Sequence, residues 1–69
     1  MTDNIYKKIE LTGTSKNSIE DAVNKAVNKA SKTVRNMRWF TLEEVRGVLN
    51  RDAVEEWQAT IKVGFTIDD

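Results

Sequence analysis

Two side chains in this sequence are suited to binding a flat molecule. Trp39 offers an aromatic ring that can stack on a ligand or pack between subunits, and taken alone it favours a subunit interface. The Gln58 amide both donates and accepts hydrogen bonds, which suits a planar heterocycle whose edge alternates carbonyl and N–H groups. Without other support, Gln58 is better explained as a solvated residue of a strand.

Paired carboxylates offer a second kind of chemistry, and the chain has two adjacent pairs: Glu43, Glu44, Glu55 and Glu56. Such pairs can transfer protons or hold a divalent cation, and together with Arg46 they would suit a small oligomeric enzyme. No glycine-rich loop accompanies them, so they are better explained as residues that solvate a hairpin. We therefore expect no enzyme, no catalytic residue and no metal ligand.

The composition limits how so short a chain can be stable. Its 69 residues include no cysteine, histidine or proline, which excludes disulfides, thiolate and imidazole metal sites and Ser-His catalysis. A chain of this length buries only about 60% of its unfolded surface as a single domain. Small domains usually compensate through disulfides, a metal or self-association, and self-association is what remains here.

Charge and hydropathy exclude two classes of partner. Eleven Lys and Arg balance eleven Asp and Glu, so the formal net charge is zero and no nucleic-acid partner is expected. Residues 1–6 lack the pattern of a signal peptide, and no apolar run approaches the roughly 20 residues of a membrane span. The expected location is cytoplasmic, with no membrane partner.

One helix follows a first strand. Alternating residues predict a strand over residues 5–12 that ends at Gly13. Ser18 followed by Asp21 resembles a capping box and predicts where the helix begins. The buried stripe of the helix is expected to run to Val34 and is rich in alanine, so the helix can lie close to a sheet.

Two further strands follow. In the first of them Phe40 and Leu42 are expected to share a face with Arg38, while Trp39 points to the other face. Beyond Leu42 the alternation loses its phase, which leaves the face of Arg46 undetermined. The last strand alternates most regularly, with one apolar face: Trp57, Ala59, Ile61, Val63, Phe65 and Ile67.

These elements predict an α+β fold, a two-layer β-α-β-β subunit formed by a single domain, residues 1–69. A helical crossover followed by a hairpin gives a three-stranded sheet in the order 1-3-2. One helix covers only one face of such a sheet. Trp39 and Gln58 fall on the uncovered face, where a ligand or another subunit would bind.

The order and spacing of four segments resemble those of the dodecins, small flavin-binding proteins that form twelve-subunit shells. The segments are YKKIELTGTS (residues 6–15), ASKTVRNMRWF (residues 30–40), EVRG (residues 44–47) and WQATIKVGF (residues 57–65). The resemblance covers nearly the whole chain. It implies a strongly curved antiparallel sheet wrapped partly around the helix, and a homododecamer.

The resemblance also implies roles for three residues. Trp39 matches the tryptophan that stacks on the isoalloxazine ring, and Gln58 matches the glutamine that binds its pyrimidine edge. Arg46 matches an arginine expected near a flavin phosphate in bacterial members. The bacterial character of the segments favours FMN over riboflavin or lumichrome, and coenzyme A has been associated with some members.

The implied function is storage of flavin, with quenching of its excited state by tryptophan. One alternative from another class is a structural homo-oligomer without a flavin, in which the aromatic residues only form interfaces. The small oligomeric enzyme considered above is the other alternative. Neither explains Trp39 together with Gln58 as well as flavin binding does.

Overall fold

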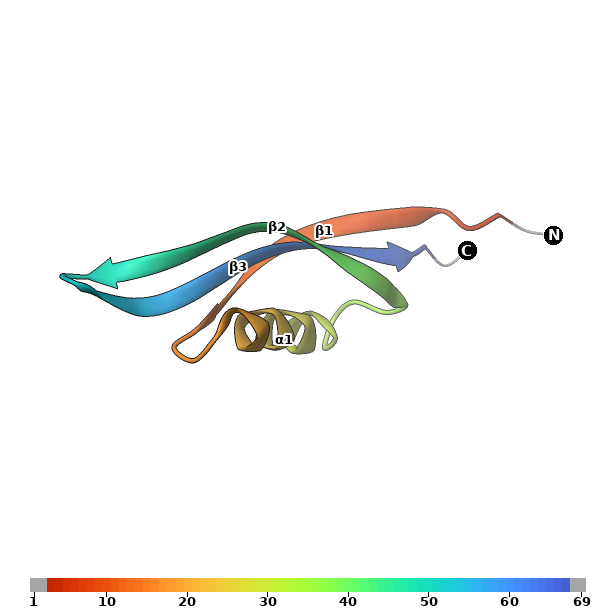
Figure 1. Ribbon diagram of the computed structural model, residues 1–69. Coiled ribbons are helices and arrows are strands. Elements are labelled where there is room, and N and C mark those ends of the chain that lie inside the picture. Colours follow the sequence, from red (N-terminus) through yellow and green to blue (C-terminus); the bar gives the residue numbers. More distant parts are fainter. Residues whose placement is uncertain (1–2, 68–69) are drawn as a thin grey trace.

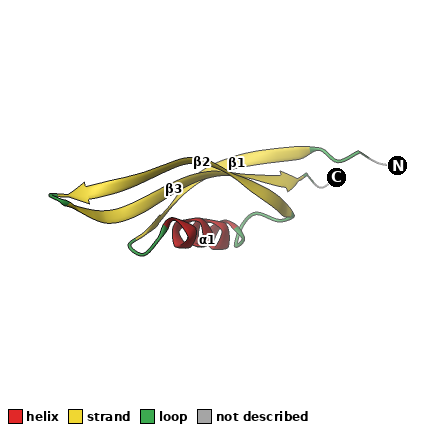
Figure 2. Ribbon diagram, viewed as in Figure 1, coloured by secondary structure: helices red, strands yellow, loops and turns green. Residues whose placement is uncertain are grey.

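The computed structural model describes residues 3–67, so residues 1–2 and 68–69 of the predicted domain lie outside the described part. It contains β1 (Tyr6–Ser15), α1 (Ile19–Ala30), β2 (Met37–Asn50) and β3 (Ala53–Thr66), in that order (Figures 1 and 2). β3 pairs antiparallel with β1 on one side and with β2 on the other. The predicted β-α-β-β order and the strand order 1-3-2 are confirmed.

The start of α1 is fixed by hydrogen bonds from side chains. Ser18 is the N-cap, and its Oγ accepts a hydrogen bond from the backbone N–H of Asp21 at 3.0 Å, as predicted. Ser15 Oγ accepts from the N–H groups of Asn17 and Ser18 at 2.9 and 3.3 Å and donates to Asp21 Oδ2 at 2.6 Å. β1 therefore continues to Ser15, past the predicted end at Gly13, since Ser15 itself organises the turn.

The helix ends earlier than its periodicity predicts. The N–H groups of Thr33 and Val34 both donate to the carbonyl of Ala30, at 3.1 and 2.8 Å. The chain thus leaves the helix through a turn, and Asn36 reverses its direction in the left-handed region, with φ of 63°. Val34 keeps the spacing of the apolar stripe without being helical.

The core lies between α1 and the two strands against which it mainly packs, β1 and β3. Its buried residues are mostly small or β-branched: Ala22, Val23, Ala26, Ala30, Ala59, Ile61 and Val63. The helix lies so close to β1 that a Cβ added to Gly13 would be 2.0 Å from the carbonyl oxygen of Ala22. The alanine-rich stripe is what permits this approach.

The β2–β3 hairpin extends well beyond the helix (Figure 1). The principal extents are 55 × 20 × 13 Å. The radius of gyration is 14.4 Å, against about 11 Å for a compact domain of this length. An isolated subunit is therefore too elongated to cover its own apolar residues.

Apolar side chains on the helix side of β2 remain uncovered. Phe40, Leu42 and Val45 pair with the buried residues Val63, Ile61 and Ala59, so they share the face that α1 covers elsewhere. They are nonetheless 49%, 45% and 40% exposed. An exposed apolar row of this kind marks an interaction surface.

Arg38 does not lie on the face predicted for it. The register shifts between Met37 and Trp39, which makes Arg38 an extra residue in β2. Its Nε donates to Thr66 Oγ1 at 3.1 Å. The bulge therefore turns Arg38 away from the side of Phe40, while Met37 takes its place against the core.

Candidate functional site

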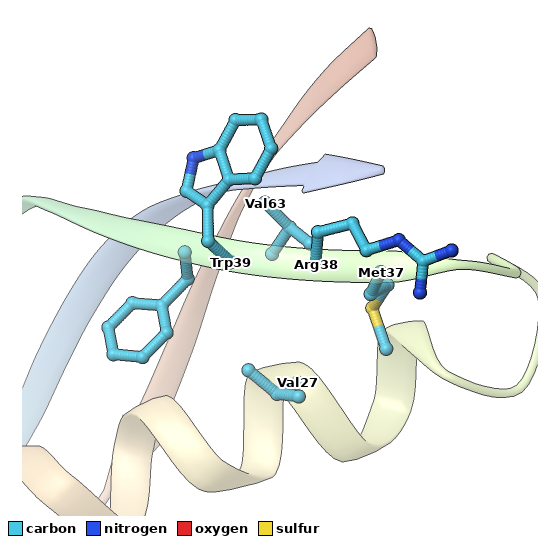
Figure 3. Close-up of a pocket in the computed structure, with 6 residues that line it drawn as sticks. Val27, Met37, Arg38, Trp39 and Val63 are labelled. Carbon is cyan, nitrogen blue, oxygen red and sulfur yellow. The ribbon is translucent and has the colours of Figure 1, made fainter. Parts of the chain in front are cut away.

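The face of the sheet opposite α1 carries the predicted site residues. Trp39 pairs with Gly64, and Figure 3 shows its ring on the side of β2 that faces away from Val27 and Met37. Arg46 pairs with Gln58, which has the same phase along β3 as Gly64. The predicted faces of Trp39 and Gln58 are therefore correct, and Arg46 joins them.

The ring of Trp39 is held by two neighbours. Its six-membered part lies over Gly64, where an added Cβ would be only 2.3 Å from Cζ2. The Tyr6 ring meets it edge-on, with centroids 4.9 Å apart and planes at 71°. Trp39 still keeps 38% of its surface exposed, so it has surface left for a further contact.

A pocket of about 270 Å³ lies beside Trp39, lined by Val27, Met37, Arg38, Trp39, Phe40 and Val63 (Figure 3). Four of these residues lie on the helix side of the sheet or in α1 itself: Val27, Met37, Phe40 and Val63. Neither Arg46 nor Gln58 contributes to it. The pocket therefore belongs to the incompletely covered apolar layer rather than to the face that carries the predicted site residues.

Arg46 is tied directly to Gln58. Its Nε donates to Gln58 Oε1 at 2.5 Å, and its Nη1 lies 3.7 Å from Glu44 Oε1. The phase of β2 changes at a register shift between Leu42 and Glu44, which explains why alternation alone left the face of Arg46 undetermined.

Glu56 is a site residue that the sequence interpretation missed. Gln58 Nε2 donates to Glu56 Oε2 at 2.9 Å, so the amide lies between a guanidinium and a carboxylate. The two residues are two positions apart on one strand and therefore share a face. That spacing is visible in the sequence, although the adjacent Glu55 makes Glu56 resemble one of a pair of hairpin glutamates.

Trp39 and Gln58 share a face but do not meet within one subunit. Trp39 pairs with Gly64, six residues beyond Gln58 on β3, which corresponds to about 20 Å along the strand. A planar ring system shorter than this separation can contact both side chains only if they belong to two different subunits.

Residues 3–67 contain no cluster of three or more His, Cys, Asp or Glu side chains placed to hold a metal ion. Over the same residues, no helix is long and apolar enough to cross a membrane.

Comparison with known proteins identifies the family. The dodecin family model matches residues 5–68. A dodecin from Thermus thermophilus is 40% identical over 65 residues, which are 94% of each chain. The chain belongs to the dodecin family. This membership supports a small, oligomeric protein of the flavin-binding type, in a family of binding proteins rather than enzymes.

Solved dodecins share the whole fold. The dodecin of Streptomyces coelicolor has a TM-score of 0.94 and 36% identity, covering 100% of this chain and 99% of its own. The dodecin of Streptomyces davaonensis has a TM-score of 0.93 and 38% identity, covering 99% and 100%. The elongated hairpin is thus part of the dodecin fold.

Proposed function

We propose that this dodecin stores flavin by stacking the isoalloxazine ring between Trp39 residues of two subunits. The observation that carries the proposal is the position of Trp39, whose ring is fixed over Gly64 on the uncovered face and remains partly exposed. Stacking of an aromatic side chain on a nucleobase contributes about 1–3 kcal/mol, and a second tryptophan would add to this. Binding of this kind needs no catalytic acid or base.

Gln58 would complete the site from a neighbouring copy. Because Gln58 lies about 20 Å from Trp39 along the sheet, a flavin stacked on one Trp39 would contact Gln58 of the partner subunit. The exposed apolar row on β2 supplies a surface through which subunits can associate. We propose a homododecamer as the assembly in which both contacts form.

FMN is the flavin that we favour, with riboflavin as the alternative. Arg46 would approach the phosphate with its guanidinium, which has N–H groups left after its hydrogen bond to Gln58. Coenzyme A stays a prediction of the family resemblance, since we find no residue pattern that favours or excludes it.

The proposed benefit of stacking on tryptophan is protection from light. Transfer of an electron from the indole to the excited flavin, followed by its return to the indole, would restore both to the ground state before the flavin reacts. The same process would make binding visible, since the emission of a bound flavin is quenched.

A structural homo-oligomer without a ligand is the second candidate. The observation in its favour is the exposure of Phe40, Leu42 and Val45, which association alone would explain. In that case Trp39 would serve only as an interface residue, and its replacement would disrupt the assembly.

The two candidates are distinguished by titrating FMN, and then riboflavin, with the purified apo-protein while flavin emission and oligomeric size are measured. We expect saturable quenching that Trp39→Ala loses while it keeps its size. Trp57→Phe is the matched control, because Trp57 lies beside Gly47 on the other face of the sheet. Unchanged emission with the wild-type protein would leave the structural homo-oligomer.

A further inference from the structure

The amide of Gln58 has only one chemically acceptable orientation. Its Oε1 accepts from Arg46 Nε, and its Nε2 donates to Glu56 Oε2. A guanidinium can only donate hydrogen bonds, and an ionised carboxylate can only accept them. A rotated amide would place N–H against N–H on one side and oxygen against oxygen on the other.

The fixed amide retains a defined binding capacity. A carbonyl oxygen has two lone pairs and an amide nitrogen has two hydrogens, so one of each is left after the contacts with Arg46 and Glu56. Where Arg46 and Glu56 take the two flanking positions of the amide, the remaining acceptor and donor lie side by side at its end. They complement a ligand edge in which an N–H group lies next to a carbonyl.

We propose that Glu56 is a positioning residue that, with Arg46, makes the site selective for an unsubstituted imide edge. This inference rests on the proposed function, in which the imide is the N3–H group of the flavin between its two carbonyls. Glu56 acts through Gln58 and does not itself touch the ligand. Its partial burial on β3 favours the persistence of its contact with Gln58.

Chemical modification of the ligand tests the selectivity directly. Riboflavin and 3-methylriboflavin differ at the imide nitrogen, so the ratio of their dissociation constants measures how strictly that edge is read. For the wild-type protein we expect the methylated flavin to bind at least about tenfold more weakly, since the methyl group removes the donor and sits against the remaining lone pair of Gln58 Oε1.

Three variants test whether the orientation of the Gln58 amide sets this ratio. Glu56→Ala leaves Arg46 as the one remaining contact that orients the amide, so the ratio should fall clearly below the wild-type value. Glu56→Gln keeps an acceptor for Gln58 Nε2 and should retain most of the ratio. Glu55→Ala is the matched control, because Glu55 accepts instead from Asn50 Nδ2, at 3.2 Å in the hairpin, and its removal should leave the ratio unchanged.

Three other results would each overturn the inference. If the wild-type protein binds both flavins equally, or if Glu56→Ala weakens both by the same factor, Glu56 does not set selectivity and the inference is wrong, while flavin storage still stands. If the wild-type protein binds neither flavin, the inference and the proposed function are both overturned.

Discussion

The indole of Trp39 occupies the space that a side chain at Gly64 would need. An added Cβ at Gly64 would lie 2.3 to 2.6 Å from three atoms of the ring, all in its six-membered part. Real Cβ atoms do not approach aromatic carbons so closely, so the two positions are mutually dependent. The absence of a side chain at Gly64 is what allows Trp39 to lie against the sheet.

Gly64→Ala should therefore displace Trp39 and impair flavin binding. We expect riboflavin quenching to require at least about tenfold more protein, a loss of stacking within the range of about 1–3 kcal/mol. The measurement is the fluorescence titration described above. Gly47→Ala is the control, because its added Cβ would lie 3.6 Å or more from Val54 and Trp57, at ordinary contact distance. Unaltered quenching by Gly64→Ala would show that binding does not depend on the position of Trp39.

Gly13→Ala should destabilise the subunit rather than the site. Its Cβ would lie 2.0 Å from the carbonyl oxygen of Ala22 and 2.9 Å from the Cβ of Ala26, so α1 would have to move away from β1. We expect the free energy of unfolding to fall by about 1–3 kcal/mol or more, as it does in other overpacked cores. Urea unfolding at a fixed protein concentration measures it, with Gly47→Ala as reference. Equal midpoints for the two variants would contradict the close packing of α1.

Leu42→Glu should weaken assembly. Leu42 lies on the helix side of β2 and is 45% exposed, so burial of its remaining surface at a subunit contact would contribute about 1 kcal/mol, less than half of a full burial. A glutamate there would add the cost of burying a charge. We expect sedimentation velocity to show smaller species at micromolar concentration. Asn24→Glu, on the exposed face of α1, should keep the size of the wild-type assembly. An unchanged Leu42→Glu assembly would exclude this surface from the interface.

Asp21 should make the fold sensitive to acid. The hydrogen bond from Ser15, and then the contact with Lys25, hold the pKa of Asp21 below its usual value of 3.8. Since the folded pKa is the lower one, the stabilisation is fully present above pH 3.8. It is lost as the pH falls through the folded pKa.

NMR titration of the Asp21 carboxyl group tests this order of causes. Ser15→Ala should raise the pKa of Asp21 towards 3.8, and Lys25→Ala should raise it less. The urea midpoint of Asp21→Asn should fall less steeply below pH 3.8 than that of the wild-type protein. If the pKa of Asp21 rose more in Lys25→Ala than in Ser15→Ala, Lys25 and not Ser15 would be the larger cause of the low pKa.

The sequence predicted those parts of the fold that depend on regular alternation. β3 has an undisturbed period of two over most of its length, so the faces of Gln58 and of the core residues Ile61 and Val63 were predicted correctly. The N-cap was also predicted, because Ser18 and Asp21 interact locally. Both the faces of β3 and the N-cap are determined by residues that lie close together in the sequence.

Features that depend on pairing between strands escaped the sequence interpretation. The bulges in β2 changed the face of Arg38 and determined that of Arg46, and a single extra residue leaves no unambiguous mark in the pattern. The separation of Trp39 from Gln58 requires the register of β2 on β3. The early end of α1 depends on the turn at Asn36, since the apolar spacing itself continues to Val34.

The central position of β3 has a consequence for folding kinetics. Tyr6 pairs with Thr66, so the first strand closes the sheet only with residues near the other end of the chain. A single two-residue turn joins β2 to β3, so this hairpin can form early, whereas pairing of Tyr6 with Thr66, 60 positions apart, costs more chain entropy. On the ribosome, β1 and α1 would emerge before their partner strand exists. β1 therefore has no strand to pair with until residues 57–66 have emerged.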